Sequence, residues 1–160
     1  MAVNILLVDD HKIVRQGLRT LLEKEPDLKV VAEAEDGRAA VRLARELSPN
    51  LVIIDLGMPD LNGIEAARQI IADAPGTKII ALSMHADRRF VTNMVKAGAS
   101  GYLLKDNAFE ELVSAIRLVL ANKTYLSPEV SDIVVKEFSA GRKGDASAYS
   151  LLTAREREVL

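Results

Sequence analysis

The sequence predicts an α/β fold in which one doubly wound parallel sheet has helices on both faces. Two observations lead to this class. Short apolar runs alternate with amphipathic segments five times, at a spacing of about 25 residues, as parallel strands joined by helices do. The run at 51–54, Leu-Val-Ile-Ile, contains no polar residue, which is typical of a strand buried on both faces. For five such units the common strand order is 2-1-3-4-5.

The expected strands are short apolar runs, each ending at a polar residue or a turn. Their ranges are 4–8, 29–34, 51–54, 78–82 and 101–104. The carboxyl ends of parallel strands meet at one edge of a sheet, and in this strand order ligands bind where the first and third strands diverge. We therefore expect the residues that follow these strands to form the functional site.

The expected helices lie between the strands and end near Pro or Gly. They cover about 11–25, 37–48, 63–74, 87–97 and 109–121. The first should carry one apolar face, and Pro26 should end it; that face comprises Ile13, Val14, Leu18, Leu21 and Leu22. A further helix should follow Ser127 as its cap and Pro128 as its first residue. Its apolar stripe must pack on the domain or on a partner; it consists of Val130, Ile133, Val134 and Phe138.

Composition excludes several classes of protein. Cysteine is absent, so disulfides and thiolate metal sites are excluded. The longest apolar runs are about five residues, too short for a membrane span, and the first residues do not resemble a signal peptide. We expect a cytoplasmic protein without a membrane partner. The net charge of −2 gives no general attraction to nucleic acid, so a role in DNA binding needs a motif.

Three carboxylates follow two strands that should be neighbours. Asp9 and Asp10 end the first strand, and Asp55 ends the third. Such close negative charges need a cation, and oxygen ligands without thiolates favour Mg²⁺. Two simpler interpretations stay open: Asp10 caps the helix that follows it, or Asp55 caps the next one. His11 is solitary and gives no support for a site built on histidine.

Two more polar residues reach the same edge. Ser83 follows the fourth strand and Lys105 follows the fifth. Alone, each is ordinarily a solvated side chain, but beside the carboxylates they describe a site that handles an anion. Mg²⁺, Lys105 and Ser83 could hold the oxygens of a phosphoryl group while Asp55 attacks the phosphorus. The glycine-rich motifs of P-loop and dinucleotide-binding proteins occur nowhere in the chain.

Four motifs in order resemble bacterial response-regulator receiver domains. They are Val-Asp-Asp-His at 8–11, Ile-Asp-Leu-Gly-Met-Pro-Asp-Leu-Asn-Gly at 54–63, Leu-Ser-Met-His at 82–85 and Gly-Tyr-Leu-Leu-Lys-Asp at 101–106. The resemblance spans about residues 3–122 and looks closest to the NarL/FixJ (LuxR-type) regulators of two-component systems. It implies that a sensor histidine kinase phosphorylates the aspartate at 55, and that the chain is a phosphoacceptor signalling domain rather than an enzyme.

The resemblance also implies roles for individual residues. Asp10 and Asp55 would bind Mg²⁺ directly, together with the carbonyl of Gly57, and Asp9 would act through water. Lys105 would pair with the phosphate and Ser83 would be the switch hydroxyl. Tyr102 would be the aromatic whose ring turns from outside to inside. Relatives often carry Asn where this chain has Gly57, so the lifetime of the phosphoryl group is left open.

The resemblance divides the chain into a receiver at 1–123, a linker helix and flexible linker at 124–150, and the start of a LuxR-type helix-turn-helix domain at 151–160. Thr153 and Glu156 have the spacing of a capping box at the start of that last helix. The chain ends before a recognition helix, so we expect DNA binding from the full-length protein and not from these residues. A phosphorylation-dependent homodimer is also implied.

Two other functions share part of this pattern. A stand-alone receiver would act by phosphotransfer or docking without DNA, and the helix start after the linker argues against it. A phosphatase of the haloacid dehalogenase class also uses an Asp nucleophile. That class needs a second Asp two residues later, where this chain has Gly57.

Overall fold

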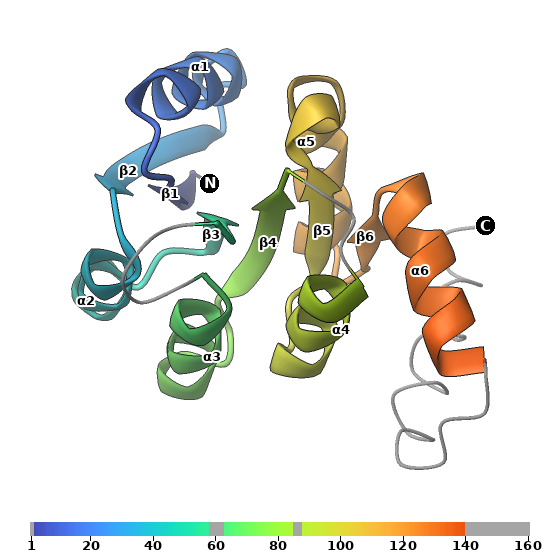
Figure 1. Cartoon of the computed structure of the whole chain (residues 1–160). Helices are drawn as coiled ribbons and strands as arrows, with labels where there is room; N and C mark the ends of the chain where they lie inside the picture. Colours follow the sequence, from blue (N-terminus) through green and yellow to red (C-terminus); the bar gives the residue numbers. More distant parts are fainter. Residues whose placement is uncertain (1, 58–62, 85–87, 140–160) are drawn as a thin grey trace.

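Figure 1 shows the computed structural model of the chain, a twisted parallel sheet with helices on both faces. The structure describes residues 2–57, 63–84 and 88–139. The strand order is β2-β1-β3-β4-β5-β6, and all neighbouring strands are parallel. The strands are β1 (Val3–Val8), β2 (Leu28–Ala34), β3 (Leu51–Asp55), β4 (Lys78–Ser83), β5 (Gly101–Leu104) and β6 (Tyr125–Leu126). The predicted fold class and the order of the first five strands are confirmed.

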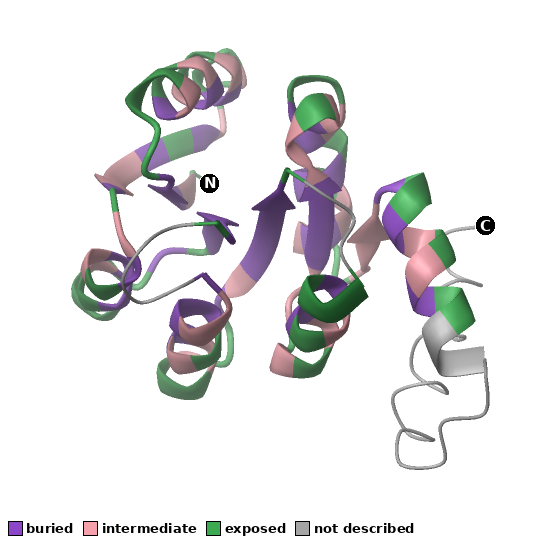
Figure 2. Cartoon of the chain, viewed as in Figure 1, coloured by how far each residue is buried: buried purple, intermediate pink, exposed green. Residues whose placement is uncertain are grey.

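Alternate residues of the central strands face opposite helical layers. Leu6 and Val8 of β1 belong to one apolar cluster with residues of α2 (Gly37–Leu47), α3 (Gly63–Asp73) and α4 (Arg88–Ala97). Ile5 and Leu7 belong to a second cluster with residues of α1 (Lys12–Glu23) and α5 (Lys105–Leu120). Figure 2 shows the central strands buried between these layers. Burial on both faces explains why the strands contain almost no polar residues.

The start of α1 differs from the prediction. The helix begins at Lys12, and His11 is its N-cap residue without a side-chain capping hydrogen bond, so Asp10 is not the cap. Ile13 was predicted to lie on the buried face, but it is 83% exposed. At about 100° per residue, Ile13 lies on the opposite side of the helix from the buried Leu18, five positions later. Asp10 is therefore left available for another role.

The sheet contains a sixth strand that the sequence analysis missed. β6 pairs in parallel with Gly101 and Tyr102 of β5. A strand of two residues has no alternation of apolar and polar side chains from which it could be recognised. The start of α5 was also misplaced, because this helix begins at Lys105 rather than near Phe109, whose exposed fraction is 50%. Lys105 therefore lies at the junction of strand and helix.

A sixth helix, α6 (Pro128–Ser139), follows β6 and packs on the domain, as the apolar stripe predicted. It lies beside α4 (Figure 1). Val130 and Val134 are buried in the same cluster as Met94 of α4. Ser127 was expected to cap the helix; its hydroxyl accepts a hydrogen bond from the backbone N–H of Leu104 at 3.3 Å. This contact connects the start of α6 to the end of β5.

The flexible linker was expected at 139–150; Ser139 is the last residue of α6, and the rest of that range lies outside the described residues, as does the expected helix-turn-helix start at 151–160. The domain boundaries therefore stay predictions. Among the helices that the structure describes, none combines the length and apolar character needed to cross a membrane.

Candidate functional site

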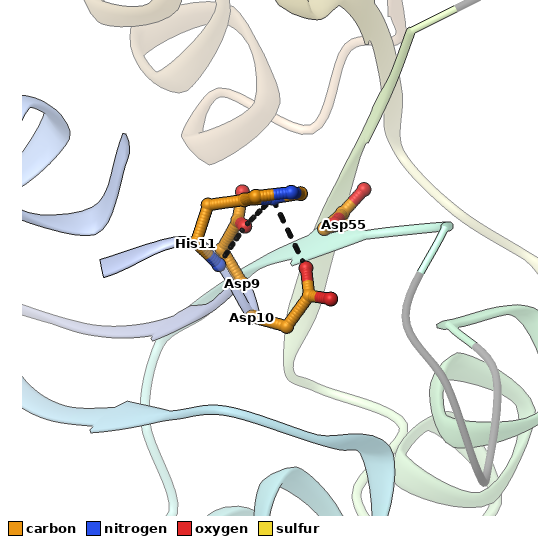
Figure 3. A group of neighbouring side chains, drawn as sticks. All are labelled: Asp9, Asp10, His11 and Asp55. Carbon is orange, nitrogen blue, oxygen red and sulfur yellow. Dashed lines mark hydrogen bonds and ion pairs between the residues drawn. The ribbon is translucent and has the colours of Figure 1, made fainter. Parts of the chain in front are cut away.

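An acidic cluster lies at the carboxyl edge of the sheet. β1 and β3 are neighbours, with Val8 opposite Ile54, so Asp9 and Asp55 each follow a paired residue and lie close together. Both are 2% exposed. One possible ligand atom from each of Asp9, Asp10, His11 and Asp55 lies within 4.8 Å of the others (Figure 3). The three carboxylates that the sequence assigned to this edge do converge.

Lys105 forms an ion pair with both buried carboxylates of this cluster. Its Nζ is 3.1 Å from Oδ2 of Asp9 and 3.1 Å from Oδ2 of Asp55, and its side chain is 9% exposed. Burial lowers the pKa of Lys105, but hydrogen bonds and charge attraction from Asp9 and Asp55 outweigh it, so this pKa is raised. The ammonium group therefore offsets negative charge at the point where β1 and β3 end.

The loop after β3 fixes the Asp55 carboxylate. The backbone N–H of Gly57 donates a hydrogen bond to Asp55 Oδ1 at 3.1 Å. A Cβ added at Gly57 would lie 3.7 Å from the same oxygen, an ordinary van der Waals distance. This position can therefore accommodate a side chain next to Asp55.

Gly63, the first residue of α3, has no such space. A Cβ there would collide with the backbone carbonyl of Asp55 and would lie 2.9 Å from Cα of Leu56. Both neighbours are backbone atoms of the strand end, which cannot move away by changing a rotamer. Glycine thus allows α3 to begin directly against the residue that carries the central carboxylate.

Ser83 and Tyr102 lie on the two strands beyond β3. Ser83 ends β4, is 5% exposed and pairs with Leu104, the residue before Lys105. Tyr102 is 1% exposed and belongs to the apolar cluster that includes residues of α4 and α6. The expected turn of its ring from outside to inside stays a prediction, because burial alone does not define the direction of the ring. The apolar stripe of α6 provides part of the environment that buries it.

Two residues at this edge were not predicted from the sequence to belong to the site. His11 was set aside as solitary, yet its Nδ1 is 3.0 Å from Oδ1 of Asp9 and 3.1 Å from Oδ1 of Asp10. Arg15 is 7% exposed and donates to the backbone carbonyl of Asp9 at 2.6 Å. The signal for Arg15 was its spacing, because it lies three residues before the buried Leu18, on the same helical face.

The donor set at this edge suits a hard divalent cation. Carboxylate oxygens from three residues meet within a few ångströms, and the chain contains no thiol. Calcium and magnesium take oxygen ligands, whereas softer metals favour sulfur and nitrogen. The ring of His11 lies beside these oxygens, with its Nδ1 3.0 Å from Oδ1 of Asp9, and its side chain is largely exposed.

Comparisons with known proteins identify the family of the chain. Residues 5–117 match the family described as response regulator receiver domain. The transcriptional regulatory protein DegU of Brevibacillus brevis is 39% identical over 172 residues, covering 99% of this chain and 73% of that protein. The crystal structure of a LuxR-family two-component response regulator from Aurantimonas sp. SI85-9A1 has a TM-score of 0.81 and 41% identity, covering 87% of this chain and 99% of that one.

A structure of the RcsB response regulator of Salmonella typhimurium, described in terms of conformational dynamism for DNA interaction, has a TM-score of 0.77 and 30% identity. The similarity covers 88% of this chain and 68% of that one. The match to the family extends over most of the chain and includes the ends of β1 to β5. This chain therefore belongs to the response regulator receiver domain family, among the LuxR-type two-component regulators that control transcription.

Proposed function

We propose that Asp55 accepts a phosphoryl group from a sensor histidine kinase, and that Mg²⁺ is the cation of the acidic cluster. Asp10, Asp55 and the carbonyl of Gly57 would hold the ion directly, with Asp9 acting through water. One observation carries the proposal: Asp55 is buried at the end of the central strand, beside the other acidic residues and 3.1 Å from Nζ of Lys105.

The transfer needs a positioned nucleophile and a way to offset negative charge. An oxygen of Asp55 attacks the phosphorus, the bond between phosphorus and the histidine nitrogen of the kinase breaks, and its electron pair leaves with that nitrogen. Mg²⁺ would offset the charge of the phosphoryl oxygens. The N–H of Gly57 orients the Asp55 carboxylate, and Lys105, already 3.1 Å from it, can pair with a phosphoryl oxygen.

The signal would leave through Ser83 and β5. Ser83 donates its hydroxyl to the new phosphoryl group, and the shift of β4 reaches β5, where Tyr102 packs with α4 and α6. Two hydrogen bonds support this route: Ser127 donates its N–H to the carbonyl of Tyr102 at 3.1 Å, and its hydroxyl accepts from Leu104. A two-state change at β5 would therefore alter how α6 is held.

The output would be control of DNA binding by the full-length protein in the cytoplasm, with phosphorylation favouring a homodimer. Similarity to DegU, a transcriptional regulatory protein, and to RcsB, whose structure concerns DNA interaction, supports this part of the proposal. In this scheme the chain acts as a signalling domain whose chemistry is limited to gaining and slowly losing its own phosphoryl group.

Two substitutions test the proposed division of roles. Asp10→Ala removes a direct ligand and should abolish Mg²⁺ binding in calorimetric titrations. Lys105→Ala removes a cation that competes for the same carboxylates, so Mg²⁺ binding should persist while the phosphorylation-dependent change in α6, followed by amide exchange, is lost. Equal loss of Mg²⁺ binding in both variants would contradict the proposal.

A further inference from the structure

Arg15 is a charged side chain that the folded chain buries. Its side chain is 8% exposed, and it lies on the inner face of α1 with Leu18 and Leu22. A guanidinium group cannot lose its charge in a protein, so a buried one needs hydrogen-bond acceptors in fixed positions. Its contacts therefore define which parts of the chain it holds together.

Three contacts of Arg15 join three elements. Nη1 donates to the carbonyl of Asp9 at 2.6 Å, Nε donates to Oε1 of Glu33 at 2.9 Å, and Nη2 donates to Oε1 of Glu35 at 3.4 Å. Glu33 belongs to β2 and lies opposite Leu7 of β1. The guanidinium thus bridges α1, the edge strand β2 and the residue that follows β1.

The side chain of Arg15 contacts the acidic cluster through the backbone of Asp9. Its carboxylate partners lie elsewhere: Glu33 is part of β2, and Glu35 follows that strand. The Asp9 N–H donates to the carbonyl of Ala34 of β2 at 3.1 Å, and the Arg15 contact holds the Asp9 carbonyl. Both ends of this residue are therefore tied to neighbouring elements. The direction in which the chain leaves β1, and with it the placement of Asp10, depends on these ties.

We infer that Arg15 is a positioning residue for the cation site: it holds the peptide after Asp9 so that the carboxylates of Asp9 and Asp10 face Asp55. This inference rests on the proposed function, because it concerns the Mg²⁺ that the acidic cluster would bind. Hydrogen-bond partners that orient metal ligands typically contribute 10–100-fold to metal affinity, as judged by their substitution.

Charge and positioning predict opposite effects when Arg15 is removed. Loss of a nearby positive charge would strengthen the attraction of the carboxylates for Mg²⁺. Loss of the contact to the Asp9 carbonyl would misalign the ligands and weaken binding. The sign of the change in Mg²⁺ affinity therefore separates the two.

Arg19 provides a matched control. It lies one helical turn after Arg15, and its Nη1 donates to Oε2 of the same Glu33 at 2.6 Å. Its contacts in the described part of the chain are with Glu33 and Glu23, not with the Asp9 carbonyl. Arg19→Ala thus makes the same change in charge on the same helix without removing the contact to the site.

The test is calorimetric titration of the 160-residue chain with Mg²⁺. Arg15→Ala should weaken binding about tenfold or more, Arg15→Lys should restore part of it, and Arg19→Ala should stay within about twofold of the unsubstituted chain. Amide exchange without Mg²⁺ should show faster exchange at 9–11 in Arg15→Ala than in Arg19→Ala. If Arg15→Ala does not fold, Arg15→Lys is compared with Arg19→Lys instead. Only Arg15→Lys should then bind Mg²⁺ more weakly than the unsubstituted chain.

Four results would overturn the inference. If Arg15→Ala binds Mg²⁺ more tightly than the unsubstituted chain, Arg15 acts on the site through its charge alone. If the two affinities are equal, Arg15 does not act on the site. Equal weakening in the Arg19 variant would mean that the network with Glu33 acts through general stability. If the unsubstituted chain does not bind Mg²⁺, the proposed function fails and this inference fails with it; normal binding with no difference between variants refutes the inference alone.

Discussion

Gly63→Ala should destabilise the domain, because the added methyl group would collide with the backbone at Asp55. The added Cβ would overlap the carbonyl oxygen of Asp55 and lie 2.9 Å from Cα of Leu56 and 3.1 Å from the carbonyl carbon of Asp55. Because these are backbone atoms, either α3 or the end of β3 must shift. Overpacking of this kind costs about 1–3 kcal/mol. For a chain of this size, about 2 kcal/mol corresponds to a decrease in Tm of about 4–8 °C.

The assay is thermal unfolding followed by circular dichroism, with Gly76→Ala as the control. Gly76 has no atom within 4 Å of an added Cβ, so the same chemical change there should move Tm by no more than about 2 °C. Phosphorylation by a small phosphodonor gives a second measurement, since a displaced Asp55 should react more slowly. If Gly63→Ala unfolds at the same temperature as Gly76→Ala, the close approach of α3 to β3 does not constrain the domain.

Three further predictions concern separate parts of the molecule. Gly57→Asn adds an amide beside Asp55, where an added Cβ meets no close contact. The amide should orient the attacking water and so shorten the lifetime of the phosphoryl group about tenfold. An unchanged rate of decay of the phosphate adduct in timed mass spectra would contradict this. Burial raises the pKa of Glu33, but hydrogen bonds from Arg19 and Arg15 outweigh it and hold that pKa below its ordinary value of 4.5. Its contribution to stability is therefore present at neutral pH and is lost as the pH falls from about 4.5 through the lower folded value. Between about pH 6 and about pH 3, the Tm of Glu33→Gln should therefore fall less than the Tm of the unsubstituted chain, and an equal fall would refute this linkage. Val134→Asp places a charge in the apolar cluster and should speed amide exchange throughout α6, whereas Val135→Asp, at a residue that is 39% exposed, should not; equal exchange in the two would mean that Val134 does not hold the helix.

The convergence of the carboxylates could be predicted because it depends on topology alone. Parallel strands align their carboxyl ends, so polar residues that follow apolar runs must meet at one edge once the strand order is known. Asp55, Ser83 and Lys105 were placed there without any knowledge of side-chain contacts. The docking of α6 was also predictable as one of two outcomes, because the spacing of Val130 and Val134 required an apolar partner.

The features that the sequence analysis missed depend on contacts between distant segments. β6 exists because the chain after α5 returns to Gly101 and Tyr102, and two residues carry no periodic signal for such pairing. Arg15 is buried because Glu33 of β2 and Glu35, just after that strand, reach it, a contact that needs the register of β1 and β2. Ile13 was assigned to the buried face because it is apolar, yet the helix turns it toward solvent.

The central claim is that Asp55 is the phosphoryl acceptor, and chemical trapping tests it most directly. The chain would be treated with a small phosphodonor and Mg²⁺, and then reduced with borohydride, which converts the carboxyl carbon of an acyl phosphate to an alcohol. Peptide mass spectrometry should then find homoserine at position 55, and no homoserine at positions 9 and 10. Homoserine at position 9 or 10, or a phosphate adduct of undiminished intensity in Asp55→Ala, would contradict the assignment.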